Sequence, residues 1–133
     1  MALGIFEEKV IENDVAIVRS RKDGIVHVTF KEGTEIDAAL QDRMIEVYLE
    51  ICGGRKRPFL YTGIGDVTIT KEGREHSKNL EDVFPTLATA VIADNLAYKL
   101  IANFYLKVHK PKTPYKVFKD IPSAEFWLKK FIE

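Results

Sequence analysis

Apolar residues follow two spacings along this chain: some alternate with polar residues, and others recur every three or four positions. The stretch "DVAIVRSRKDGIVHVTF" predicts a β-hairpin, because β-branched residues fill positions 15–19 and 25–30 and the Asp-Gly between them favours a tight turn. In the second strand, His27 and Thr29 face one side of the sheet and Val28 faces the other.

The helical spacing predicts four helices, at residues 37–51, 71–80, 94–108 and 120–132. Short apolar runs between them predict three further strands, at residues 57–62, 86–93 and 115–119. Strands that alternate with helices imply parallel crossover connections, and the opening hairpin adds an antiparallel strand. We therefore expect one α/β domain over residues 1–133 with a mixed sheet, and a loosely ordered N-terminal extension at residues 1–14.

The composition is balanced in charge. The 133 residues are 46% hydrophobic, and Lys+Arg and Asp+Glu both number 20, so the formal net charge is zero. This balance argues against nucleic acid or an acidic membrane surface as a partner, because both require a surplus of positive charge. No apolar stretch approaches the roughly 20 residues of a membrane-spanning helix. The N-terminal segment lacks the features of a signal peptide, and a cytoplasmic protein is expected.

Residues that commonly carry chemistry are few. Cys52 is the single cysteine, and its place at the end of an apolar helix face predicts a small buried hydrophobe. His27, His76 and His109 lie on separate elements, so no metal site is predicted. The basic run "GGRKRP" at residues 53–58 could bind an anion or an acidic partner. Alternatively, its charges stay solvated and complement the negative end of the preceding helix.

The loop "YTGIGDVTIT" follows a predicted strand and precedes a predicted helix, and three interpretations of it are open. As a dinucleotide fingerprint, Gly63-x-Gly65 lacks the third glycine, and Asp66 places negative charge where a pyrophosphate would lie. As a phosphoacceptor or docking loop, it presents Thr68 and Thr70 at a helix start, where a phosphate interacts favourably with the helix dipole. As a plain turn, its glycines let the chain leave the strand sharply, and Asp66 and Thr70 satisfy backbone donors.

Three segments carry a family likeness: "ATAVIAD" at residues 88–94, "ANFYLKVHKPKTPYKVFKD" at residues 102–120 and "AEFWL" at residues 124–128. They resemble the SpoIIAA-like proteins, relatives of the STAS domains of bacterial anti-sigma-factor antagonists, and the likeness is greatest to standalone bacterial members. It covers most of the chain from about residue 15 onward. The resemblance implies a mixed sheet of about four to five strands with helices mainly on one face.

The resemblance also implies a function. STAS domains act by binding partner proteins rather than by catalysis, and some sense nucleotides or small ligands. Antagonist members carry a phosphorylatable Ser, usually after an Asp, at the start of the helix that follows the third strand. Asp66-Val67-Thr68 keeps an Asp-x-hydroxyl spacing with Thr in place of Ser, and Thr70 is a second candidate.

The sequence therefore predicts a non-enzymatic regulatory or interaction module, without cofactor or metal, that binds a protein partner or itself through the loop from Gly63 to Thr70. A homodimer through the third helix is a further hypothesis, because Tyr98 and Tyr105 share one face of it. The alternative function is small-ligand binding or sensing in an apolar pocket between the sheet and the C-terminal helices. The residues expected to line that pocket are Phe104, Phe118, Phe126 and Trp127.

Overall fold

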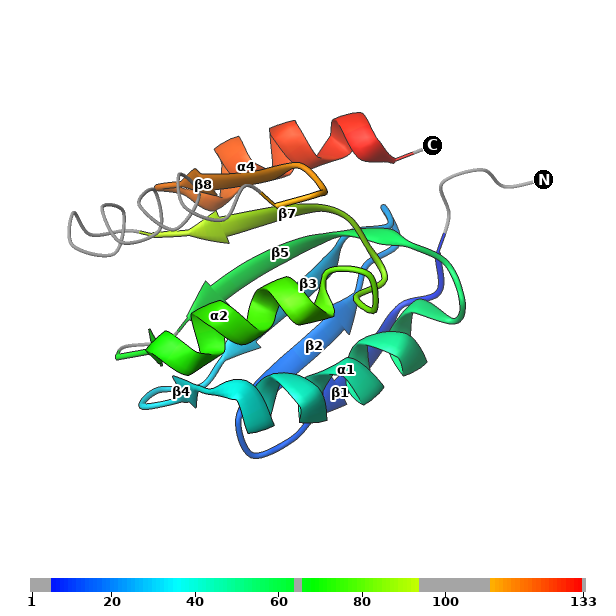
Figure 1. Cartoon of the computed structure of the whole chain (residues 1–133). Coiled ribbons are helices and arrows are strands. Elements are labelled where there is room, and N and C mark those ends of the chain that lie inside the picture. Colours follow the sequence, from blue (N-terminus) through cyan, green and yellow to red (C-terminus); the bar gives the residue numbers. More distant parts are fainter. Residues whose placement is uncertain (1–5, 64–65, 94–110, 133) are drawn as a thin grey trace.

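The computed structural model describes residues 6–63, 66–93 and 111–132 (Figure 1). In this part of the chain, the main sheet has six strands in the spatial order β1 (Lys9–Glu12), β2 (Ala16–Ser20), β3 (Val26–Phe30), β5 (Arg57–Gly63), β7 (Thr86–Ile92) and β8 (Tyr115–Phe118). A second sheet pairs β4 (Glu35–Ile36) with β6 (Thr68–Ile69). The described helices are α1 (Ala38–Cys52), α2 (Lys71–Leu80) and α4 (Ile121–Leu128), the last followed by the 3₁₀ turn η1 (Lys129–Phe131).

The main sheet is mixed, as the sequence predicts. Strands β1, β2 and β3 pair antiparallel, whereas β3, β5, β7 and β8 pair parallel. The turn between β2 and β3 uses Gly24, whose φ of 97° suits glycine, and the carboxylate of Asp23, which accepts a hydrogen bond from the Ile25 amide. The α/β fold class and the N-terminal hairpin are thereby confirmed.

Strand β1 lies within the segment for which a loosely ordered extension is predicted, and it brings the main sheet above the expected four to five strands. Three of its residues are exposed, and only Ile11 packs against the buried cluster under α1. Asn13 holds the turn into β2, because its side-chain oxygen accepts hydrogen bonds from the amides of Val15 and Ala16, both at 2.9 Å. An edge strand this short contains too few apolar residues to give a periodic signal.

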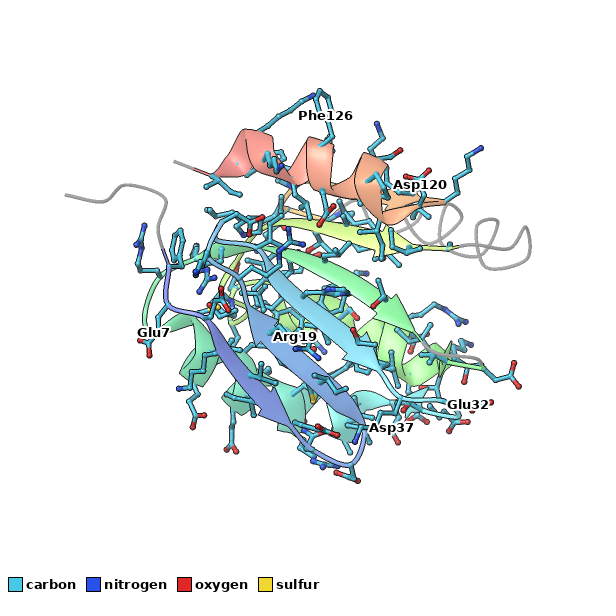
Figure 2. The ribbon with its side chains drawn as sticks, turned by 180° about the vertical axis from the view of Figure 1, so that it is seen from behind. Glu7, Arg19, Glu32, Asp37, Asp120 and Phe126 are labelled. Carbon is cyan, nitrogen blue, oxygen red and sulfur yellow. The ribbon has the colours of Figure 1, made fainter. Side chains whose placement is uncertain are left out.

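Helices cover both faces of the sheet, because neighbouring residues of the central strand β5 enter two separate cores. Phe59 belongs to the cluster that contains Met44 and Tyr48 of α1, and Leu60 belongs to the cluster that contains Leu128 of α4. Figures 1 and 2 show α1 and α2 on one face and α4 on the other. The expectation of helices mainly on one face holds for α1 and α2, whereas α4 is needed to bury the opposite side of β5 and β7.

The helix ends follow the capping signals in the sequence. The Asp37 carboxylate accepts a hydrogen bond from the Leu40 amide at the start of α1, and Gly53 ends that helix in the left-handed conformation. The Asp120 carboxylate accepts a hydrogen bond from the Ser123 amide and caps α4. The predicted helices that correspond to α1, α2 and α4 are confirmed, and the one predicted at residues 94–108 lies outside the described residues.

Gly73, in the first turn of α2, has no space for a side chain. A Cβ atom at this position would lie 2.5 Å from the backbone oxygen of Ile36. Replacing glycine by alanine in a helix normally stabilises it by about 1 kcal/mol, but this clash with a backbone atom reverses the sign. We expect Gly73→Ala to lower the free energy of unfolding by about 1–3 kcal/mol, as measured by urea denaturation.

The matched control is Asn79→Ala, because Asn79 is exposed in the same helix and its replacement should leave stability unchanged or raise it slightly. If Gly73→Ala proves as stable as the wild type, then α2 moves away from Ile36 at no cost. The close contact between the start of α2 and β4 would then be dispensable.

Candidate functional site

The predicted loop after β5 is tied to the segment after β3 by the short parallel sheet of β4 and β6. The Thr68 amide donates a hydrogen bond to the Thr34 carbonyl, and the Thr70 amide donates to the Ile36 carbonyl, both at 3.0 Å. This structure lies where the parallel strands β3 and β5 end, beside the start of α2 (Figure 1). We term it the ledge, and it comprises residues 32–36 and 66–70.

The two threonines of the ledge use their hydroxyl groups differently. Thr70 Oγ1 accepts a hydrogen bond from the Gly73 amide at 2.9 Å and caps α2, as the sequence predicts. Thr68 is exposed, and its hydroxyl forms no hydrogen bond within the described part of the chain. Asp66 is exposed as well. Of the two candidate phosphoacceptors, Thr68 is therefore the one that a partner can reach without removing a helix cap.

Gly63 does not have a positive φ, and its role is to leave space for the chain that returns beside it. A Cβ atom at this position would lie 3.0 Å from Cγ2 of Val67, so a larger residue would press against the returning chain. The sharp turn predicted at Gly63 is thus a close approach between two segments of the loop. Gly65, the second glycine of the predicted Gly-x-Gly, lies outside the described residues.

The surface of the ledge is acidic. Its exposed carboxylates, together with one in the first turn of α2, form no ion pair with other described residues; they are Glu32, Glu35, Asp66 and Glu72. Lys31 is adjacent in the sequence but is paired with Glu12 at 2.7 Å. Glu35 is the strand partner of Thr68, so their side chains lie side by side on one face of the β4–β6 sheet. Figure 2 shows Glu32 at this end of the molecule.

Among the described residues predicted to line an apolar pocket, two pack against each other and one points away from the sheet. Phe118 of β8 packs against Trp127 of α4, with ring centroids 5.6 Å apart, and Trp127 also contacts Phe131. The assignment of Phe126 is wrong, because this side chain is 75% exposed on the outer side of α4 (Figure 2). Successive helical residues point about 100° apart, so Trp127 and Phe126 cannot both face the sheet. Phe104 lies outside the described residues.

A polar cluster that no pattern in the sequence predicts lies on the sheet face beside α4. Nε2 of His27 is 2.9 Å from the Thr62 hydroxyl, which is in turn 3.1 Å from the Thr29 hydroxyl. The alternation in β3 correctly places His27 and Thr29 on one face. The contribution of Thr62 follows only from the register between β3 and β5, which no local pattern predicts.

The environment of His27 favours the neutral imidazole. Burial lowers the pKa of His27, and the positive charges of Arg21 and Arg19 lower it further, while Glu125 has a smaller opposite effect. An imidazole this close to the Thr62 hydroxyl has the separation of a base and a nucleophile. Within the described residues, however, no side chain binds Nδ1 of His27, the atom that an orienting carboxylate would hold. We therefore interpret the cluster as structural.

The other sequence candidates have local roles. Cys52 is buried, and burial raises the pKa of its thiol to about 11, which fits the predicted small hydrophobe. His76 lies 2.7 Å from the Asp42 carboxylate, and His109 is outside the described ranges. No group of three potential metal ligands occurs among the residues that the structure places. Arg57 departs from the expected solvated basic run, because it is only 3% exposed.

Two expectations about partners concern other parts of the chain. Tyr98 and Tyr105, the proposed homodimer surface, lie outside the described residues. None of the helices in the described ranges has the length and apolar character required to cross a membrane.

Comparison with known families matches residues 19–132 to a family described as Domain of unknown function (DUF7793). No curated protein matches the chain. One similar solved structure is an uncharacterized protein from the DUF3478 family with a SpoIIAA-like fold from Shewanella loihica PV-4. It covers 96% of this chain and 99% of its own, with a TM-score of 0.56 and 12% identity. A protein with unknown function from Arthrobacter sp. FB24 covers 84% of this chain and 96% of its own, with a TM-score of 0.30 and 21% identity.

The Shewanella structure bears on the fold alone, because its sequence identity to this chain is low. Its SpoIIAA-like fold extends over nearly the whole of both chains. The fold implied by the residues at 88–94, 102–120 and 124–128 is therefore confirmed.

The lowered pKa of His27 predicts a dependence of stability on pH. Folded His27 binds a proton less readily than unfolded His27, so stability is fully present above the unfolded pKa of about 6.5 and falls as pH drops toward the folded pKa. His27→Gln keeps a hydrogen-bonding group beside Thr62 but does not titrate. We expect the wild type to lose more unfolding free energy than His27→Gln between about pH 7.5 and pH 5. Parallel urea-denaturation profiles for the two proteins would contradict this.

The pairing of Glu35 with Thr68 predicts a repulsion when Thr68 becomes acidic. Thr68→Glu places a second carboxylate beside Glu35, and like charges at paired strand positions destabilise a sheet. We expect Thr68→Glu to cost about 0.2–1 kcal/mol of unfolding free energy, and Glu35→Gln to remove most of that cost. A double-mutant cycle by urea denaturation measures the coupling. A coupling of zero would mean that these side chains do not face each other.

Proposed function

Because the chain belongs to the DUF7793 family, a domain of unknown function, we propose its function from its own surface: it is a non-enzymatic interaction module that binds a protein partner through the ledge. The observation that carries the proposal is the exposed hydroxyl of Thr68, which has no hydrogen-bond partner among the described residues and lies on a backbone that is hydrogen-bonded to the opposite segment. A group presented in this way loses little conformational freedom when a partner binds it.

The charge of the ledge supports a partner with a basic surface. Glu35 and Asp66 flank Thr68 and have no cationic partner among the described residues, so a Lys- or Arg-bearing surface would gain ion pairs without breaking existing ones. A second copy of the chain is less suitable at this surface, because two ledges facing each other would bring like charges together. The proposal retains the expected cytoplasmic location.

Modification of Thr68 would act on the same surface. A phosphoryl group there adds about 1.5 to 2 negative charges at pH 7. It would strengthen attraction to a basic partner, but it would also be repelled by Glu35 across the β4–β6 sheet. Thr70 is a poorer acceptor, because modification of its hydroxyl removes the cap of α2.

The test uses a pull-down from native cell lysate with matched charge variants as baits. Glu35→Gln/Asp66→Asn removes the two ledge carboxylates that flank Thr68, whereas Glu46→Gln/Glu50→Gln removes the same charge from exposed positions on α1. We expect the wild type and the α1 variant to capture a basic protein that the ledge variant and Thr68→Ala lose. Capture should also weaken as ionic strength rises to about 0.5 M, since exposed charges are then screened.

Equal capture by the ledge variant and the α1 variant would contradict the proposed surface. Mass measurement of the wild-type bait from native cells addresses modification separately. Phosphate on Thr68 would support a switchable ledge, and phosphate on Thr70 would contradict the distinction drawn between the two hydroxyls.

A further inference from the structure

A half-open pocket of about 250 Å³ lies at the opposite end of the parallel strands from the ledge. It is formed where β5 and β7 begin, beside the β2–β3 turn at Gly24 and the η1 turn after α4. The wall contains residues from both ends of the described chain, since Phe6 and Ile132 both line it. At about 30 Å³ for each water molecule, the volume equals roughly eight waters, the size of a small substituted ring.

One cation of the pocket, Arg57, is buried and held in place by hydrogen bonds. Arg57 is only 3% exposed, and its Nε donates a hydrogen bond of 2.7 Å to the Gly24 carbonyl. Its Nη2 donates to the Ser20 hydroxyl at 2.9 Å and to the Arg21 carbonyl at 3.5 Å. All these acceptors are neutral, and Nη1 of Arg57 has no acceptor among the described residues. Arg57 therefore brings a positive charge to the pocket wall, together with a donor, Nη1, that no described residue uses.

Arg57 forms no ion pair with a described acid. Asp23, in the adjacent turn, attracts the Arg57 charge without contacting it, because its carboxylate is 2.7 Å from Arg21 and pairs with that residue. No Asp or Glu lines the pocket, whereas Arg55 and Lys56 line it beside Arg57 and form no ion pair with any residue that the structure describes. Burying a charge without a counterion is costly, so an anion bound here would offset part of that cost.

The rest of the pocket wall is apolar. The ring of Phe6 lies 4.3 Å from the guanidinium carbon of Arg57 and 4.6 Å from that of Arg55, so it packs against both cations. Leu87 and Phe131 also belong to the apolar side, and Leu87 is 37% exposed although it is large and hydrophobic. The site therefore combines clustered positive charge with an apolar surface of the kind that small-molecule pockets share.

We propose that this pocket binds a small organic anion. Its carboxylate or phosphate lies against Arg57 Nη1, Arg55 and Lys56, and its apolar body lies against Phe6, Leu87 and Phe131. The planar guanidinium of Arg55 suits both types of anion, because each presents two oxygens to it, and Arg57 adds the single donor Nη1. The inference is independent of the proposed protein-binding function, since the pocket and the ledge share no residue.

The test is a calorimetric titration of the full chain with four probes. Phenylphosphate and phenylacetate share a ring and differ in the anion, inorganic phosphate lacks the ring, and benzyl alcohol lacks the charge. We expect at least one of the two aromatic anions to bind, and to bind about tenfold or more tightly than inorganic phosphate and benzyl alcohol. The ratio between phenylphosphate and phenylacetate then identifies the headgroup.

Two charge variants and one apolar variant test whether the binding occurs at this pocket. Arg55→Gln/Lys56→Gln changes two exposed side chains, and Lys71→Gln/Lys78→Gln removes the same charge from exposed positions on α2. We expect the first pair to weaken binding about tenfold and the second pair to leave it unchanged. Leu87→Trp should fill the apolar side of the pocket and weaken binding of the aromatic anion, without changing the affinity for inorganic phosphate. Arg57 is left intact, because its hydrogen bonds hold the β2–β3 turn.

Three results would overturn the proposal. The first is that neither aromatic anion binds the folded wild type at about 10 mM, a concentration that detects even very weak sites. The second is equal affinity in the two charge variants, which would place the binding elsewhere on the surface. The third is equal affinity for benzyl alcohol and the aromatic anions, which would remove the role of the cations.

Discussion

The arrangement of the whole molecule depends on the burial of strand β5 on both faces. The strand lies between two parallel neighbours, β3 and β7, and its residues from Arg57 to Leu60 are buried. Alternation sends Phe59 toward α1 and Leu60 toward α4, so each face requires its own helical cover. Pro58 interrupts the pairing within this buried strand, because proline cannot donate a hydrogen bond to a neighbouring strand. The register between β5 and β7 shifts between Arg57 and Pro58.

A strand covered on both faces leaves its ends as the natural places for polar chemistry. At the amino end, the Arg57 side chain donates hydrogen bonds to Ser20 and Gly24, beside and within the β2–β3 turn, and so places a positive charge in a buried position. At the carboxyl end, Gly63 lets Val67 approach closely, and the chain continues into the hydrogen-bonded ledge. The His27 cluster lies between these ends, where its hydrogen bonds satisfy polar groups on a sheet face. The amino end of β5 thus carries a buried cation, and its carboxyl end leads into an exposed, hydrogen-bonded segment.

Local signals predicted much of this fold, because they act over a few residues. Asp37 and Gly53 mark the ends of α1, and alternation assigned the faces of β3 correctly. The features that the sequence did not predict depend on contacts between segments that are far apart in the chain. The strands β4 and β6 have two residues each and exist through contacts between segments far apart in the chain, which also make Glu35 the neighbour of Thr68. Burial of Arg57 likewise depends on carbonyl groups of a distant turn, whereas composition alone predicts a solvated charge.

Although the net charge of the sequence is zero, charges of opposite sign gather at the two ends of strand β5. Clustered cations line the pocket at the amino end of β5, and the ledge at its carboxyl end carries carboxylates that no described cation pairs with. The seven residues of β5 span roughly 20 Å, more than twice the Debye length of about 8 Å at physiological ionic strength. The charges at one end therefore have little influence on a charged group at the other end. A net charge of zero argues against an extended polyanion as a partner, but it leaves room for an anion at one end and a basic protein at the other.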